Sequence, residues 1–169
     1  MSHLLFLLRH AKSDWKKDVA TDFERPLSER GLSDAQKMAN WMVQLTDLPT
    51  MIVSSPALRA YQTALIFAHA LDMQPGDINF DKRIYAGSVS NILDRIKQFP
   101  ETTKSILLVG HNPGFDSLLQ TLCKMAEYRA GGKLMTTAAI AKVNVASSWQ
   151  RISSNSCELS RFTRPKELS

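Results

Sequence analysis

Residues 3–8 read HLLFLL and are followed at once by Arg9 and His10. Two later stretches have the same form, because Met51–Ser54 and Ser105–Val109 are also short, apolar and followed by polar or glycine residues. Short apolar runs of this kind are typical of strands that are buried on both faces of a sheet. The sequence therefore predicts three buried strands.

Helical patterns lie between these predicted strands. Ser33 and Gln36 fit a capping box, after which apolar residues recur at steps of three and four along one face. Ser55 and Pro56 fit an N-cap followed by proline at the first helical position. Two further helical patterns and one late strand are expected at Ile92–Ile96, Phe115–Met125 and Ala138–Val145.

Strands that alternate with helices of this length predict an α/β sandwich with a mostly parallel sheet, because parallel neighbours need helical crossovers. Gln74–Lys82 is rich in turn formers, so we expect a loop there. The 169 residues and their 44% hydrophobic content fit a single domain with a buried core. We expect this domain to cover residues 1–160. Residues 161–169 lack apolar periodicity, so we expect them to form a flexible tail.

The composition narrows the classes of protein that fit. The apolar run from Leu4 to Leu8 is too short for a signal peptide or a membrane span, so we expect no membrane association and a cytoplasmic location. Cys123 and Cys157 lack the close spacing of zinc ligands; a reducing compartment fits them, and a disulfide stays open.

The net charge of +5 and the pI of about 9.4 raise the question of nucleic-acid binding. The basic residues are scattered and are not interleaved with aromatic residues, so we expect no nucleic-acid partner. Anionic small substrates and acidic protein surfaces both remain compatible with this charge.

The predicted topology gathers one set of polar residues. Ligands of open α/β sheets bind outside the carboxyl ends of the strands. Arg9 and His10 end the first strand, Arg59 lies in the first turn of the helix after the second, and Gly110 and His111 end the third. Arginine side chains bind phosphoryl oxygens in a bidentate manner, and a neutral imidazole beside them can act as a nucleophile. The sequence therefore predicts a phosphoryl-transfer site at this edge.

Four sequence blocks follow one another over residues 4–115. They are Leu8-Arg9-His10-Ala11-Lys12-Ser13, then Arg25-Pro26-Leu27-Ser28 with Gly31, then Ser54-Ser55-Pro56 with Arg59, Gln62 and Thr63, and finally Gly110-His111-Asn112-Pro113. In this order they resemble the motifs of the histidine phosphatase superfamily. The short chain and Thr136-Thr137-Ala138 resemble its SixA-type phosphohistidine phosphatases in particular. The resemblance implies a three-layer sandwich of the phosphoglycerate mutase-like kind, with helices on both faces of the sheet.

The resemblance also implies a role for each matching residue. His10 resembles the nucleophile, and Arg9 and Arg59 resemble the clamps that hold the phosphate. His111 resembles the second histidine, which stabilises the transferring phosphoryl group and contacts the substrate. Arg25 is a weaker candidate for substrate binding at the pocket rim. The implied enzyme is a phosphatase that forms a phosphohistidine intermediate and needs no metal and no cofactor.

The expected partner is a phosphorylated protein, either a histidine phosphotransfer domain or a phosphocarrier of a sugar phosphotransferase system. Two alternatives stay open. The chain could hydrolyse a small phosphorylated substrate as a phosphomonoesterase, or it could be a non-catalytic module that binds phosphate through the same arginines.

A general acid is not identified by the sequence. Where some relatives have an acidic residue after the tyrosine, this chain reads Tyr85-Ala86-Gly87. Asp14, Asp22 and Glu24 are the nearby acids, and we interpret each as a solvated loop residue. Trp15 is interpreted as a packing residue or as part of the pocket mouth.

Overall fold

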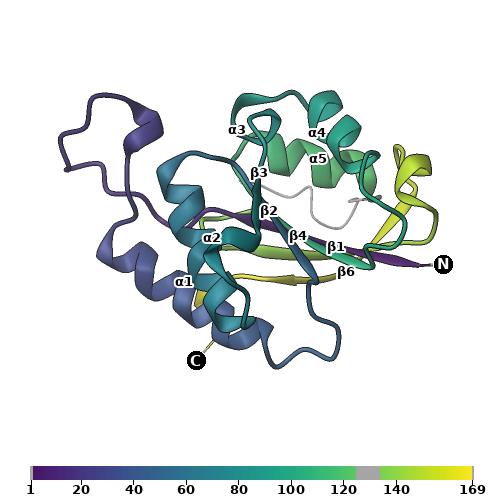
Figure 1. Cartoon of the computed structure of the whole chain (residues 1–169), viewed down its shortest axis with the longest axis horizontal. Coiled ribbons are helices and arrows are strands. Elements are labelled where there is room, and N and C mark those ends of the chain that lie inside the picture. Colours follow the sequence, from purple (N-terminus) through teal and green to yellow (C-terminus); the bar gives the residue numbers. More distant parts are fainter. Residues whose placement is uncertain (1, 125–133, 169) are drawn as a thin grey trace.

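The computed structural model describes residues 2–124 and 134–168 and contains one six-stranded sheet in the order β3-β2-β4-β1-β5-β6 (Figure 1). The strands are β1 (His3–Arg9), β2 (Met51–Ser54), β3 (Ile78–Phe80), β4 (Ser105–Gly110), β5 (Ile140–Val145) and β6 (Cys157–Thr163). Strands β3, β2, β4 and β1 are parallel, whereas β5 is antiparallel to both of its neighbours. The α/β fold with a mostly parallel sheet is thereby confirmed.

Helices cover both faces of this sheet and make the fold a three-layer sandwich (Figure 1). The helices α1 (Glu29–Met42) and α2 (Leu58–Ala70) pack on one face. The helices α3 (Arg83–Ala86), α4 (Val89–Ile96) and α5 (Gly114–Leu122) pack on the other. Short 3-10 helices lie at Asp22–Glu24, Pro75–Asp77, Trp149–Arg151 and Pro165–Glu167. None of the helices in the described part is long and apolar enough to cross a membrane.

The continuous apolar run in β1 follows from its central position. Leu5 and Leu7 contribute to the core beneath α3, α4 and α5, whereas Phe6 and Leu8 contribute to the core beneath α1 and α2. Successive side chains of a strand point to opposite faces, so a strand covered on both faces needs apolar residues at every position.

Two predicted helix starts are wrong. The N-cap of α1 is Ser28, five residues before the expected Ser33, because the side chain of Ser28 accepts the Gly31 N–H at 3.1 Å. Helix α2 begins at Leu58 after Ala57. The Ser55 hydroxyl accepts the Ala57 N–H at 3.3 Å from a position outside the helix, and its oxygen also contacts a histidine of the site described below. The predicted helix around Ile92–Ile96 is confirmed, and Met125 of the next pattern lies outside the described residues.

The later part of the chain contains more regular structure than expected. Strand β3 lies where we expected only a loop, and its three residues are too few to show periodicity. Strand β6 includes the first residues of the expected tail, which pair with β5. Leu168 packs against the core beneath α1 and α2, so the terminal stretch differs from the expected loose tail. Cys123 and Cys157 are free thiols.

Gly31 generates a prediction about stability. A Cβ atom at Gly31 would lie 2.0 Å from the Lys12 carbonyl oxygen, because α1 packs directly on the backbone that follows the first strand. We expect Gly31→Ala to lower the free energy of unfolding by about 2 to 3 kcal/mol, since overpacking outweighs the better helix propensity of alanine. Urea denaturation measures this change.

Gly76→Ala is the matched control, because a Cβ at Gly76 meets nothing within 4 Å. It should change the free energy of unfolding by no more than about 0.5 kcal/mol. Equal urea midpoints for the two variants would contradict the packing assigned to Gly31.

Candidate active site

A pocket of about 290 Å³ lies at the carboxyl ends of β1 and β4 and beside the start of α2. Its lining residues are Arg9, His10, Lys12, Ser13, Trp15, Arg25, Arg59, His111, Asn112 and Thr137. The structure therefore brings all five predicted site residues into one pocket. The side chains of His10, Arg25, Arg59 and His111 are buried and that of Arg9 is partly buried, although all five are polar or charged.

The register of the central strands places the two histidines side by side. Arg9 of β1 pairs with Gly110 of β4, so His10 and His111 leave two parallel strands at the same level. The His10 N–H donates to the Gly110 carbonyl at 2.9 Å and extends this pairing by one residue. The two imidazole ring centroids are 4.9 Å apart.

The hydrogen bond of His10 assigns its tautomer. Its Nδ1 lies 2.7 Å from the carbonyl oxygen of Ala11, and a carbonyl can only accept, so Nδ1 carries the proton. The lone pair of the neutral ring is then on Nε2. Burial and, to a smaller extent, the positive charges of Arg59, Arg9 and Arg25 lower the pKa of His10, the Ala11 bond opposes them, and the pKa is about 4 as a result. The ring is therefore neutral near pH 7 and has a free Nε2.

His111 is held by Ser55, the residue that the sequence predicts to be a helix N-cap. Its Nε2 lies 2.7 Å from the buried Ser55 hydroxyl, while its Nδ1 is buried without a partner among the described residues. Burial and the charges of the neighbouring His10 and Arg59 together lower the pKa of His111 to about 3. The edge of the Tyr85 ring packs against the imidazole at a centroid distance of 5.4 Å.

Two of the three arginines, Arg25 and Arg59, meet at Asp22. Arg59 donates from Nη1 to the Asp22 carbonyl at 2.7 Å and from Nη2 to its carboxylate at 2.9 Å. Arg25 donates to the other carboxylate oxygen of Asp22 and to the Ser13 hydroxyl. Burial raises the pKa of Asp22, but the bonds and charges of Arg25 and Arg59 outweigh this and lower it. Asp22 is thus half exposed but bound to two site arginines, which differs from the solvated loop residue that we expected.

Unpaired donors remain in this pocket. The Nε atoms of Arg9 and Arg59 are buried and have no hydrogen-bond partner within the described residues. Buried polar groups are usually paired, so unpaired guanidinium donors that line a pocket indicate a site for an anion. Burial lowers the pKa of Arg9. The guanidinium still stays charged, because arginine side chains are not deprotonated in proteins.

Several residues that support the site were not singled out from the sequence. The hydroxyl of Thr63 accepts the Ala11 N–H at 3.1 Å and so fixes the backbone after His10. Asn112 and Thr137 line the pocket. Thr63, Asn112 and Thr137 all belong to the sequence blocks that resemble the family motifs, so this resemblance could have indicated them. Trp15 lies at the mouth, where it is 76% exposed and has the Arg25 guanidinium carbon 3.4 Å from its ring centroid.

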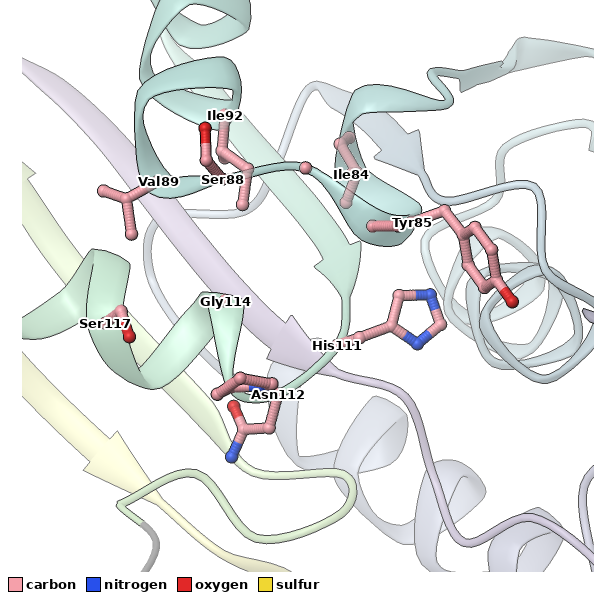
Figure 2. Close-up of a pocket in the computed structure, with 12 residues that line it drawn as sticks. Ile84, Tyr85, Ser88, Val89, Ile92, His111, Asn112, Gly114 and Ser117 are labelled. Atoms are coloured by element: carbon pink, nitrogen blue, oxygen red, sulfur yellow. The ribbon is translucent and has the colours of Figure 1, made fainter. Parts of the chain in front are cut away.

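A second recess of about 290 Å³ adjoins the first and shares His111 and Asn112 with it. Figure 2 shows Tyr85 and His111 at one end of this recess and Val89 and Ser117 at the other. Its further lining residues are Ile84, Ala86, Gly87, Ser88, Ile92, Pro113 and Gly114. Among the described residues, neither recess has Asp or Glu in its lining. The paired recesses can therefore hold an anionic group and, beside it, an uncharged group.

Comparisons with known proteins agree with this geometry. Residues 5–84 match the model of the histidine phosphatase superfamily (branch 1). An uncharacterised chloroplast protein of Arabidopsis thaliana is 30% identical over 158 residues, which cover 89% of this chain and 70% of the relative. Phosphohistidine phosphatase SixA of Escherichia coli is 29% identical over 146 residues, which cover 85% of this chain and 86% of the relative.

A solved structure of the protein histidine phosphatase SixA in complex with tungstate has the same fold. It superposes with a TM-score of 0.79 at 24% identity and covers 97% of this chain and 98% of its own. Family model, relatives and fold agree on one conclusion: the chain belongs to the histidine phosphatase superfamily and is a SixA-type phosphatase.

Proposed function

We propose that this phosphatase removes the phosphoryl group from phosphohistidine on a partner protein, with His10 as the nucleophile and without a metal ion. The carrying observation is the Nδ1 bond of His10 to the Ala11 carbonyl, which leaves Nε2 unprotonated in a pocket that three arginines line. The expected partners are a histidine phosphotransfer domain or a phosphocarrier. The name of the Escherichia coli relative, a phosphohistidine phosphatase, supports this substrate class.

The first step forms a bond between His10 Nε2 and phosphorus and breaks the phosphorus–nitrogen bond of the substrate. Arg9, Arg59 and Arg25 neutralise the equatorial oxygens, and the free Nδ1 of His111 is available to one of them. The departing imidazole takes its proton from solvent. In the second step, water attacks phosphorus, inorganic phosphate leaves, and His10 returns to its neutral form.

We expect His10→Ala to abolish turnover, because no other unprotonated nucleophile is held at this position. The wild-type enzyme, quenched during turnover in excess EDTA, should carry an acid-labile, base-stable phosphoryl group on His10. Phosphopeptide mass spectrometry locates the group. His69→Ala is the matched control, because His69 belongs to α2 and does not line the pocket. Labelling that survives in His10→Ala, or turnover that EDTA stops and a divalent ion restores, would reject the mechanism.

The pH dependence should follow the lowered pKa of His10. A nucleophile must be unprotonated, and a pKa of about 4 in place of 6.5 keeps His10 unprotonated down to roughly pH 5. With an aryl phosphate, kcat/KM corrected for ionisation of the substrate should therefore stay level to about pH 5 and fall below it. Arg25→Ala removes one of the charges that lower this pKa and should move the acidic limb to higher pH. If kcat/KM of the wild-type enzyme already fell with a midpoint at pH 6.5, the lowered pKa of His10 would be contradicted.

The leaving group should decide which substrates react. An alkoxide leaves poorly without a proton donor, which contributes roughly a hundredfold or more to ester hydrolysis, whereas the imidazole of phosphohistidine leaves once solvent protonates it. Because no carboxylate lines either recess of the described structure, we expect kcat/KM to be highest for a phosphohistidine protein, lower for aryl phosphates and lowest for sugar phosphates. Phosphate release from each substrate measures this order.

Nearly equal kcat/KM values for an aryl and an alkyl phosphate would show that a general acid is present. Asp14, Asp22 and Glu24 would then be the first residues to replace. A preference for sugar phosphates over phosphohistidine would instead favour the small-molecule phosphomonoesterase.

A further inference from the structure

Asp116 lies in the first turn of α5 and is absent from the lining of the phosphate pocket. Its carboxylate nevertheless holds the backbone beside that pocket. The Met135 N–H donates to Oδ1 at 2.8 Å, and the Leu134 N–H donates to Oδ2 at 3.2 Å. Two bonds from consecutive N–H groups to one carboxylate fix both the position and the direction of this peptide segment.

The carbonyl of the same residue, Met135, accepts hydrogen bonds from two residues of the pocket. Arg9 donates to this carbonyl from Nη1 at 2.8 Å, and Asn112 donates from Nδ2 at 3.0 Å. The Oδ1 of Asn112 accepts the Asp116 N–H at 3.2 Å, which closes a ring of hydrogen bonds. The carbonyl of Met135 therefore orients the Arg9 guanidinium, and Asp116 holds the N–H of the same residue.

Asp116 also acts on Arg9 through its charge. Burial lowers the pKa of Arg9, and the negative charge of Asp116 opposes this effect. Asp22, in contrast, binds Arg25 and Arg59 directly. Asp116 has no direct hydrogen bond to Arg9 and is connected to it through the backbone of Met135.

We propose that Asp116 is a positioning residue that holds the Arg9 guanidinium in its phosphate-binding orientation through the backbone of Met135. This inference rests on the proposed function, in which Arg9 binds the phosphoryl group. A purely structural Asp116 would join α5 to residues 134 and 135 without any specific effect on Arg9.

A double-mutant cycle separates these two roles. Tungstate is the probe, because its binding by calorimetry requires no turnover. Asp116→Asn should raise the Kd for tungstate about tenfold or more, since a displacement of about 1 Å at a positioning group costs up to a hundredfold. In the Arg9→Ala background, the same replacement should change the Kd less than about twofold, because the group that Asp116 positions is gone.

Asp34→Asn is the matched control. Asp34 is a largely buried carboxylate on α1 that pairs with Arg30, and it does not line the pocket. It should leave the Kd for tungstate unchanged. Circular dichroism checks that every variant is folded. If Asp116→Asn is unfolded, Asp116→Glu replaces it in the cycle, because the longer side chain keeps the charge but displaces the Met135 peptide.

Equal effects of the Asp116 replacement in the two backgrounds would overturn the inference, as would failure of the wild-type protein to bind tungstate. The proposed function fails separately. A wild-type protein that binds tungstate with a non-additive cycle, but does not hydrolyse phosphohistidine or aryl phosphates, would retain the Asp116 inference and lose the proposed reaction.

Discussion

The parallel pairing of β1 with β4 is the constraint on which the site depends. Six consecutive residue pairs, from Leu4 with Ser105 to Arg9 with Gly110, set the two strand ends level. A register shift of one residue would turn every side chain of one strand to the opposite face and would separate the two imidazoles. The apolar residues of both strands prevent such a shift, because each of them belongs to a defined core. Core packing and site geometry are therefore one property of the same twelve residues.

Charge is the second organising feature of this site. Three arginines and two histidines share one small pocket, and burial disfavours the charged forms of Arg9, His10 and His111. The structure resolves the conflict by keeping both imidazoles neutral and by giving two guanidinium groups the carboxylate of Asp22. An incoming phosphoryl group brings the negative charge that the remaining unpaired donors require. The neutral imidazoles and the unpaired guanidinium donors thus have the same origin.

The sequence predicted the fold class and the central strands because buried parallel strands and crossover helices have clear hydrophobic patterns. It also predicted that Arg9, His10, Arg59 and His111 would gather, because the ends of parallel strands meet at one edge. Arg25 was expected at the pocket rim from the family resemblance alone. Helix starts were less predictable. Ser28 and Ser33 are both acceptable N-caps, and the structure uses Ser28, whose hydroxyl accepts the Gly31 N–H and donates to the Lys12 carbonyl. Ser55 was misassigned because a hydroxyl that holds an imidazole has the same sequence signal as a helix cap. Asp116 acts through a peptide nineteen positions later, and no local pattern reports such a contact.

The stacking of Arg25 on Trp15 gives the chain an optical property. One face of the indole contacts a guanidinium at 3.4 Å, while the side chain as a whole is 76% exposed to solvent. Trp149, in contrast, is fully buried and packs against His3 and Phe99, and it does not line the pocket. The fluorescence of Trp15 depends on where the guanidinium sits and on how much water reaches the ring. The protein therefore contains an intrinsic fluorophore at the entrance to its pocket, in contact with one of the arginines that line it, and we expect its emission to change when Arg25 moves.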